Sequence, residues 1–149
     1  MTRNAITVGA SAETVFSVLA DPRAYDNLLP GARRVRRFDH DWPSPGSALH
    51  QTLGFGPVGL SEAVEVVDVD EPCVLRLRAR LMPLCLHRID FLLHTEDGGT
   101  YVLVEAWPVS GPTSKVWNPL LEQLAWTRNE ELLRRLRGMV EHRRQPLGV

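Results

Sequence analysis

The segment from Cys73 to Leu93, CVLRLRARLMPLCLHRIDFLL, alternates between apolar and polar side chains almost without interruption. Leucine or alanine occupies every odd position from Leu75 to Leu81, and arginine occupies the even positions between them. A period of two places successive side chains on opposite faces of a β-strand. The segment therefore predicts strands of an antiparallel sheet with one apolar and one polar face.

Turn signals divide the rest of the chain into further elements. A short strand at 6–8 precedes Ser11, an expected N-cap, and a helical repeat of apolar residues. Pro22 suits the first turn of a second short helix, which Pro30-Gly31 ends. Further strands are expected at RRVRRF, ALHQTLGF, LSEAVEVVDV, CVLRLRARL, CLHRIDFLL and TYVLVEAWPV, separated by turns rich in glycine, proline or aspartate. From about Ser114 to Arg143 the period becomes 3.6, which predicts one long helix.

Length and composition limit the classes of protein. A chain of 149 residues suits one domain, residues 1–149, and 44% apolar with 23% charged residues is ordinary for a globular protein. The net charge of −1 gives no electrostatic footprint for nucleic acid. No window approaches the ~20 apolar residues that span a bilayer, and the N-terminus lacks the apolar core of a signal peptide. We expect a cytoplasmic protein without integral membrane contact, in which Cys73 and Cys85 are not bonded to each other.

The segment ASAETVFSVLADPRAYDNLLPG, residues 10–31, resembles the start of START-like (SRPBCC) proteins, the superfamily of polyketide cyclases, lipid-transfer domains and the birch-pollen allergen. Its Asp-Pro-x-x-Tyr and Leu-Pro-Gly patterns match theirs, and TRNEELLRRLR, residues 127–137, resembles the end of their C-terminal helix. The resemblance implies an α+β helix-grip fold. In that fold a curved antiparallel sheet, here of seven strands, wraps a long C-terminal helix, and two short helices follow the first strand. A cavity lies between sheet and helix.

The turns determine which face of the sheet points inward. A three-residue turn at 82–84 pairs Leu81 with Cys85, and the Asp97-Gly98 hairpin faces Leu93 to Val102. Both turns give the same inner face, which is apolar apart from His87. The outward set is then Arg76, Arg78, Arg80, Arg88 and Glu105.

Outward arginines weaken one enzymatic interpretation. Some aromatase/cyclases of the resembling superfamily use pocket arginines and a tyrosine to steer an anionic polyketide. Burying unpaired guanidinium groups costs several kcal/mol each, and no carboxylate in the neighbouring strands obviously offsets that cost. A β-bulge would reverse the orientation.

The expected cavity lining comes from the fifth to seventh strands and the long helix. Its residues are Leu77, Ala79, His87, Ile89, Phe91, Val102, Val104, Trp117, Leu121, Leu124 and Arg128. Phe55, Met82 and Trp117 lie on connections at one end of the meander, where they form the cavity mouth or cap the core.

Three residues are candidates for catalysis. Arg128 lies at the centre of an apolar helical arc, as a cationic anchor for a ligand or as the partner of Glu62 or Glu65. His87 is a ligand contact or a core histidine. Tyr25 presents its hydroxyl to the cavity or packs between helices.

The apolar arc of the long helix consists of Trp117, Leu121, Leu124, Leu132 and Met139. A second ridge, Trp126, Leu133 and Val140, packs on the short helices near Val15 and Leu19, or forms a dimer contact. A monomer and a homodimer both remain open.

Three functions fit this pattern, none with a metal or other cofactor. No histidine pair has metal-ligand spacing, and phosphate-binding, dinucleotide-binding and nucleophile-elbow motifs are absent. The first function is binding of a small hydrophobic molecule. The second is a polyketide cyclase or aromatase, and the third is a protein-partner module of the chaperone-activator type.

Overall fold

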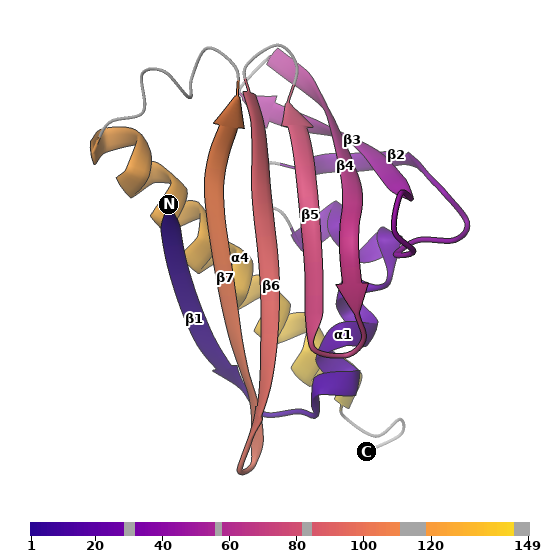
Figure 1. Cartoon of the computed structure of the whole chain (residues 1–149), viewed down its shortest axis with the longest axis vertical. Coiled ribbons are helices and arrows are strands. Elements are labelled where there is room, and N and C mark those ends of the chain that lie inside the picture. The colour runs from indigo at the N-terminus through magenta and orange to yellow at the C-terminus, as the bar shows by residue number, and fades with distance from the viewer. Residues whose placement is uncertain (29–31, 56–57, 82–84, 111–118, 145–149) are drawn as a thin grey trace.

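One antiparallel sheet in the order β1-β7-β6-β5-β4-β3-β2 organises the computed structural model (Figure 1). The structure describes residues 1–28, 32–55, 58–81, 85–110 and 119–144. The strands are β1 (Thr2–Val8), β2 (Ala32–Phe38), β3 (Ala48–Phe55), β4 (Val58–Asp70), β5 (Val74–Leu81), β6 (Cys85–Glu96) and β7 (Gly99–Ser110). The helical elements are α1 (Ala12–Leu19), the 3₁₀ turn η1 (Pro22–Ala24), α2 (Tyr25–Leu28) and α4 (Pro119–Arg144).

The expected registers of the two central hairpins are confirmed. Leu81 pairs with Cys85, and Leu93 pairs with Val102. The inner faces of β5, β6 and β7 are accordingly apolar, and Phe91 is 1% exposed. Local turn chemistry thus determines which side chains of these strands enter the core.

The strand register shifts at one point in the β4–β5 pairing and at one point in the β6–β7 pairing. The β4–β5 register shifts between Val66 and Asp68, so Val67 is 36% exposed. Because of this shift, Val69 faces inward beside Leu75 while Asp68 faces outward. A second shift lies between Leu86 and His87 of β6, at the point where β7 contains a proline that has no amide hydrogen to donate.

The short helices close one end of the sheet. Ser11 caps α1 by accepting from the amide of Thr14, and Asp21 caps η1 by accepting from the amide of Arg23. Val15, Phe16 and Leu19 of α1 are buried. These apolar side chains form one core with side chains from the C-terminal half of α4 and from the inner face of the sheet.

The long helix α4 runs diagonally behind the sheet in Figure 1. Its backbone lies against β1, α1 and α2. Asn4 of β1 donates to the carbonyl of Trp126 at 3.1 Å and to the Glu130 carboxylate at 2.8 Å. Asn129 donates to the Thr2 hydroxyl at 2.9 Å. These polar contacts fasten the helix to the β1 edge of the sheet.

The second ridge of α4 follows the expectation in two of three positions. Leu133 and Val140 are buried and belong to the core that contains Val15 and Leu19, whereas Trp126 is 43% exposed. Packing on α1 therefore accounts for Leu133 and Val140.

The outer face carries the arginines, as predicted. Arg78 and Arg80 are exposed and Arg76 is half-buried, whereas Leu75 and Leu77 are buried. The expectation that no carboxylate offsets these arginines is wrong. Arg78 lies 3.1 Å from the Glu65 carboxylate, and Asp90 accepts from Arg76 at 2.6 Å and from Arg88 at 3.2 Å.

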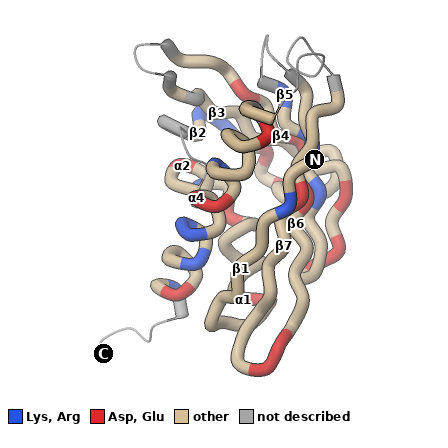
Figure 2. The backbone as a smooth tube through the Cα atoms, turned by 90° about the vertical axis from the view of Figure 1, so that its left-hand side faces the viewer, with Lys and Arg blue, Asp and Glu red and all other residues tan. Residues whose placement is uncertain are grey.

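Acidic and basic residues are spread over the strands and α4 in Figure 2. The free thiol of Cys73 excludes a bond to Cys85, as expected. In the described residues, no helix is long and apolar enough to cross a bilayer.

Two glycine substitutions are expected to change stability in opposite directions. A Cβ on Gly99 would lie 2.3 Å from the backbone oxygen of Val8, so Gly99→Ala must displace β1 or β7. We expect it to lower the free energy of unfolding by about 2–3 kcal/mol. Gly138 of α4 has nothing within 4 Å of its Cβ position, and Gly138→Ala should raise the free energy by about 0.5–1 kcal/mol. Urea denaturation measures both changes, and equal effects would contradict the close approach at Gly99.

Candidate functional site

A polar pair interrupts the apolar inner face of β3 and β4. Gln51 and Glu62 are register partners, and the Gln51 side-chain amide donates to the Glu62 carboxylate at 2.7 Å. Both side chains share their parity with inward apolar neighbours, Leu49 on β3 and Val64 on β4. Gln51 is 0% exposed and Glu62 is 2% exposed. A carboxyl group is therefore held inside the fold.

Burial is the main influence on the protonation of Glu62. Removal from water penalises the charged form and raises the pKa of the carboxyl above its usual value. The nearby Arg128 charge, and then the hydrogen bond from Gln51, oppose that rise. Arg128 and Glu62 do not form an ion pair within 4.0 Å. The alternative in which Arg128 pairs with Glu62 or Glu65 is thus not observed, and Glu65 pairs with Arg78 instead.

His87 lies on the same inner face, two strands away. It pairs in register with Ala79 of β5 and with Pro108 of β7. Burial, followed by the positive charge of Arg128, lowers the pKa of His87 to about 4. The imidazole is therefore neutral near pH 7, and Arg128 from α4 acts electrostatically on both His87 and Glu62.

The rotation of α4 differs from the expected one. Among the described side chains of the helix, the buried ones are Asn129, Leu132, Leu133, Leu136 and Val140. Arg128 projects about 100° from Asn129, so it lies at the edge of this buried face and not at its centre. Leu124 lies farther round, at about 140° from Asn129, and is 58% exposed. The expectation that Leu124 faces the sheet is wrong because the hydrogen bonds from Asn4 to the Trp126 carbonyl and from Asn129 to Thr2 turn the Asn129 side of the helix toward β1.

Tyr25 packs in the core and does not join this group. Its side chain is 0% exposed, and its hydroxyl donates to the carbonyl of Leu19 at 2.9 Å. Trp42 meets its ring edge-on at a centroid distance of 5.6 Å. Burial raises the pKa of the phenol further above its ordinary value. The structure therefore removes Tyr25 from the candidate proton-transfer residues.

The remaining expected lining falls into two groups. The buried strand residues are Leu77, Ala79, Ile89, Phe91, Val102 and Val104. The expected positions Met82 and Trp117, and the side chains of Phe55 and Leu121, lie outside the described residues. The strand part of the lining is inward-facing as expected, and the mouth remains a prediction.

The inner face remains partly accessible to solvent at one end, where β6 begins and β7 ends. Ala106 and Pro108 have the inward parity of β7, yet both are only half-buried. His87 and Arg128 are half-buried too. Toward α1, by contrast, Val102 and Leu75 are 0% exposed. Inward side chains of β6 and β7 therefore remain partly accessible opposite the first half of α4.

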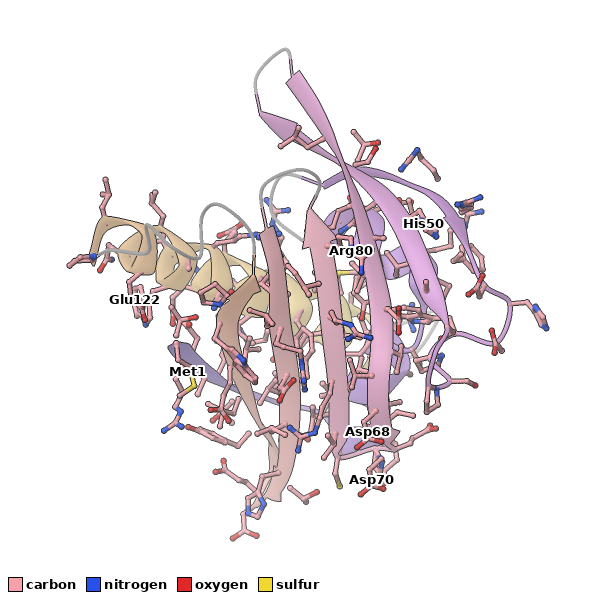
Figure 3. All side chains as sticks on the ribbon, turned by 45° about the horizontal axis from the view of Figure 1, so that its top comes forward. Met1, His50, Asp68, Asp70, Arg80 and Glu122 are labelled. Carbon is pink, nitrogen blue, oxygen red and sulfur yellow. The ribbon has the colours of Figure 1, made fainter. Side chains whose placement is uncertain are left out.

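A separate concavity lies on the outer face of the sheet. It has a volume of about 150 Å³ and is lined by Ala48, His50, Ala63, Glu65, Arg78, Arg80 and Leu86. Figure 3 shows His50 and Arg80 on this face. Burial and the charges of Arg37 and Arg36 lower the pKa of His50, against an opposing effect of Asp39. In the part of the chain that the structure describes, no three His, Cys, Asp or Glu side chains are grouped to hold a metal ion.

The sequence interpretation missed Gln51 as a site residue and considered Glu62 only as a partner of Arg128. The alternation of β4 contained the signal, because Glu62 has the parity of Val64 and Val66. Carrying the inward parity across the hairpin to β3 would have placed Gln51 beside Glu62.

Comparison with known proteins identifies the fold. No protein-family model matches the chain, and no curated protein matches it. Protein CV1439 from Chromobacterium violaceum has a TM-score of 0.76 at 14% identity over 94% of this chain and 96% of its own. Ara h 8.0201 has a TM-score of 0.74 at 12% identity over 95% and 97% of the two chains.

A third solved structure, the di-domain ARO/CYC StfQ from the steffimycin biosynthetic pathway, has a TM-score of 0.75 at 10% identity. It is matched over 95% of this chain and 50% of its own, so the chain corresponds to about half of that protein. The seven-stranded sheet, the helices after β1 and the long C-terminal helix define the helix-grip fold. These similarities establish the fold.

Proposed function

We propose that this chain binds a small hydrophobic molecule between the inner face of the sheet and the first half of α4. The observation that carries the proposal is the accessibility of Ala106, Pro108 and His87, which point inward yet are only half-buried. Ala79 of β5 and Ala106 of β7 are small inward side chains on either side of β6, so they leave room for a guest. Ligand sites are commonly apolar concavities with a few convergent polar groups, as these strands and the Gln51–Glu62 pair would provide.

Filling this space is expected to abolish binding of an apolar dye. Ala79→Phe adds a ring beside His87, and we expect its affinity for the neutral dye Nile red to fall about tenfold or more. Since Ala79 is 0% exposed, the larger side chain can also disturb packing. Ala106→Phe, at a half-buried position of the same face, provides the second test. Fluorescence titration measures the affinity, and circular dichroism verifies the fold.

Ala63→Phe is the matched control, because Ala63 neighbours Val64 on β4 but lines the outer concavity. Its dye affinity should equal that of the parent. If Ala63→Phe prevents binding while both inner variants bind normally, the dye occupies the outer face. If the parent itself binds no dye, the hydrophobic-binding function is wrong and the protein-partner module becomes the better hypothesis.

A second candidate function is cyclisation of a bound polyketide by aldol condensation. The observation that favours it is the position of a buried carboxyl, Glu62, and a neutral imidazole, His87, around the charge of Arg128. Such groups can move a proton and stabilise an enolate oxygen. A poly-β-ketone assay would test it: Glu62→Gln should reduce turnover about 100-fold while Nile red binding persists. Unchanged turnover would exclude Glu62 from the chemistry.

A further inference from the structure

Three buried polar atoms of the site have no hydrogen-bond partner in the described residues. They are the Gln51 Oε1, the Glu62 Oε2 and the Arg128 Nη2 atoms. Two of these belong to side chains that are at most 2% exposed, and both side chains point to the inner face. Folded proteins pair more than about 90% of such groups. Three unpaired atoms on facing elements therefore indicate a place that pairs with a group from outside the chain.

The energetic cost of this arrangement is considerable. Leaving a buried donor or acceptor unsatisfied costs about 1–3 kcal/mol, and more for a charged group. A purely apolar ligand would pair with none of the three atoms and would leave that cost in place. The Gln51–Glu62 pair consequently favours a ligand with a polar end.

The donor and acceptor types of the three atoms restrict which chemical group the polar end of the ligand carries. Gln51 Oε1 accepts hydrogen bonds, Arg128 Nη2 donates them, and Glu62 Oε2 accepts when the carboxyl is ionised. A ligand carboxylate could pair with Arg128 but only accepts, so it would oppose the Gln51 oxygen and an ionised Glu62. A ligand ammonium would be repelled by Arg128. A hydroxyl group both accepts and donates, and it suits either protonation state of Glu62.

The positions of Glu62 on β4 and Arg128 on α4 agree with a polar ligand group held between this strand and the helix. Glu62 Oε1 is occupied by Gln51 at 2.7 Å, which fixes the carboxyl plane and leaves Oε2 free. Arg128 approaches from α4 and interacts electrostatically with Glu62 and His87. Because Arg128 forms no ion pair with Glu62, its Nη2 remains available for a third group.

We propose that Gln51, Glu62 and Arg128 recognise the neutral hydroxyl end, phenolic or alcoholic, of an otherwise apolar ligand. This inference rests on the proposed binding function and specifies its ligand class. The hydroxyl accepts from Arg128 Nη2 and donates to Glu62 Oε2 or Gln51 Oε1, while the apolar body lies along the inner faces of β5 to β7.

The test compares four probes of one shape by displacement of Nile red at pH 7.5: 2-naphthol, 2-methoxynaphthalene, 2-naphthoate and naphthalene. We expect 2-naphthol to bind about tenfold more tightly than 2-methoxynaphthalene, which cannot donate, and than 2-naphthoate, which is anionic. The paired variant Gln51→Leu/Glu62→Leu should lose this preference and still bind naphthalene. 2-Naphthol should also bind more tightly than naphthalene in the parent, and Arg128→Met, which keeps an apolar side chain, should reduce that preference because the ligand oxygen loses its donor. Glu65→Leu, on the outer face of the same strand, should retain it.

Each result has a defined consequence. Equal affinity of 2-naphthol and 2-methoxynaphthalene in a parent that binds Nile red overturns the hydroxyl inference and leaves the binding function intact. A preference over 2-methoxynaphthalene that survives Gln51→Leu/Glu62→Leu, or a preference over naphthalene that survives Arg128→Met, also overturns it. Should the paired variant fail to fold, Arg128→Met decides. Absence of Nile red binding and of direct 2-naphthol fluorescence changes in the parent overturns both proposals.

Discussion

Replacing both Arg76 and Arg88 by methionine is expected to lower the free energy of unfolding by about 3–5 kcal/mol. Asp90 is 3% exposed and accepts from Arg76 at 2.6 Å and from Arg88 at 3.2 Å. The double variant would leave this carboxylate buried without a counter-charge. Breaking a buried ion pair from one side is more costly than the pair is stabilising, because the remaining charge stays desolvated.

Arg80 provides the matched control on the same strand and face. It is exposed, so Arg80→Met should change the free energy of unfolding by about 0.5 kcal/mol or less. Adding Asp90→Asn to the double variant should recover part of the loss, because it removes the uncompensated charge. Urea denaturation at pH 7.5 measures all three proteins. A double variant that unfolds with the midpoint of Arg80→Met would show that Asp90 is solvated despite its burial.

The indole of Trp107 extends this network on the outer face. The Arg88 guanidinium lies 5.4 Å from the centre of the Trp107 ring, within the range of a cation–π interaction. Part of the loss in the double variant therefore comes from this contact. The single variant Arg76→Met, which spares Trp107, should fall between Arg80→Met and the double variant.

Acidification is expected to destabilise the protein through His87. The folded-state pKa of His87 is lowered from 6.5 to about 4, so below pH 6.5 the unfolded chain binds the proton more readily than the folded chain. The stability that this residue contributes is complete above pH 6.5 and is lost as the pH falls toward 4. Between pH 7.5 and 4.5 the loss amounts to about 2–3 kcal/mol.

His87→Gln should remove this component and flatten the fall in unfolding free energy by that amount. His94→Gln is the control, since His94 is an exposed residue of the same strand. Glu62 acts in the opposite sense: its raised pKa gives stability that is present at low pH and is lost as the pH rises above 4.5. Comparing each variant with the parent isolates the histidine. Parallel pH profiles for His87→Gln and His94→Gln would mean that His87 is solvated.

The strand pattern was predictable because it depends on local chemistry. Alternation at Leu75, Leu77 and Ala79 determines the buried parity of β5, and the short turns transmit that parity to β6 and β7. The orientation of the arginines followed from this parity. Their carboxylate partners were missed, although Asp90 faces Arg76 directly in the register, because the parity of β6 was considered for its apolar side and not for its polar side.

Alternation and turn residues were sufficient to predict the sheet, the short helices and the long helix, since a period of two or 3.6 and a tight turn are properties of neighbouring residues. The site required the tertiary structure. Hydrogen bonds from Asn4 and to Thr2 rotate α4, which moves Leu124 outward and Arg128 to the edge of the buried face. These contacts join residues more than 120 positions apart, so no local pattern contains them. The burial of Glu62 beside Gln51 likewise depends on which strands pair and on what covers them, because a carboxyl group is solvated or desolvated only by its three-dimensional surroundings.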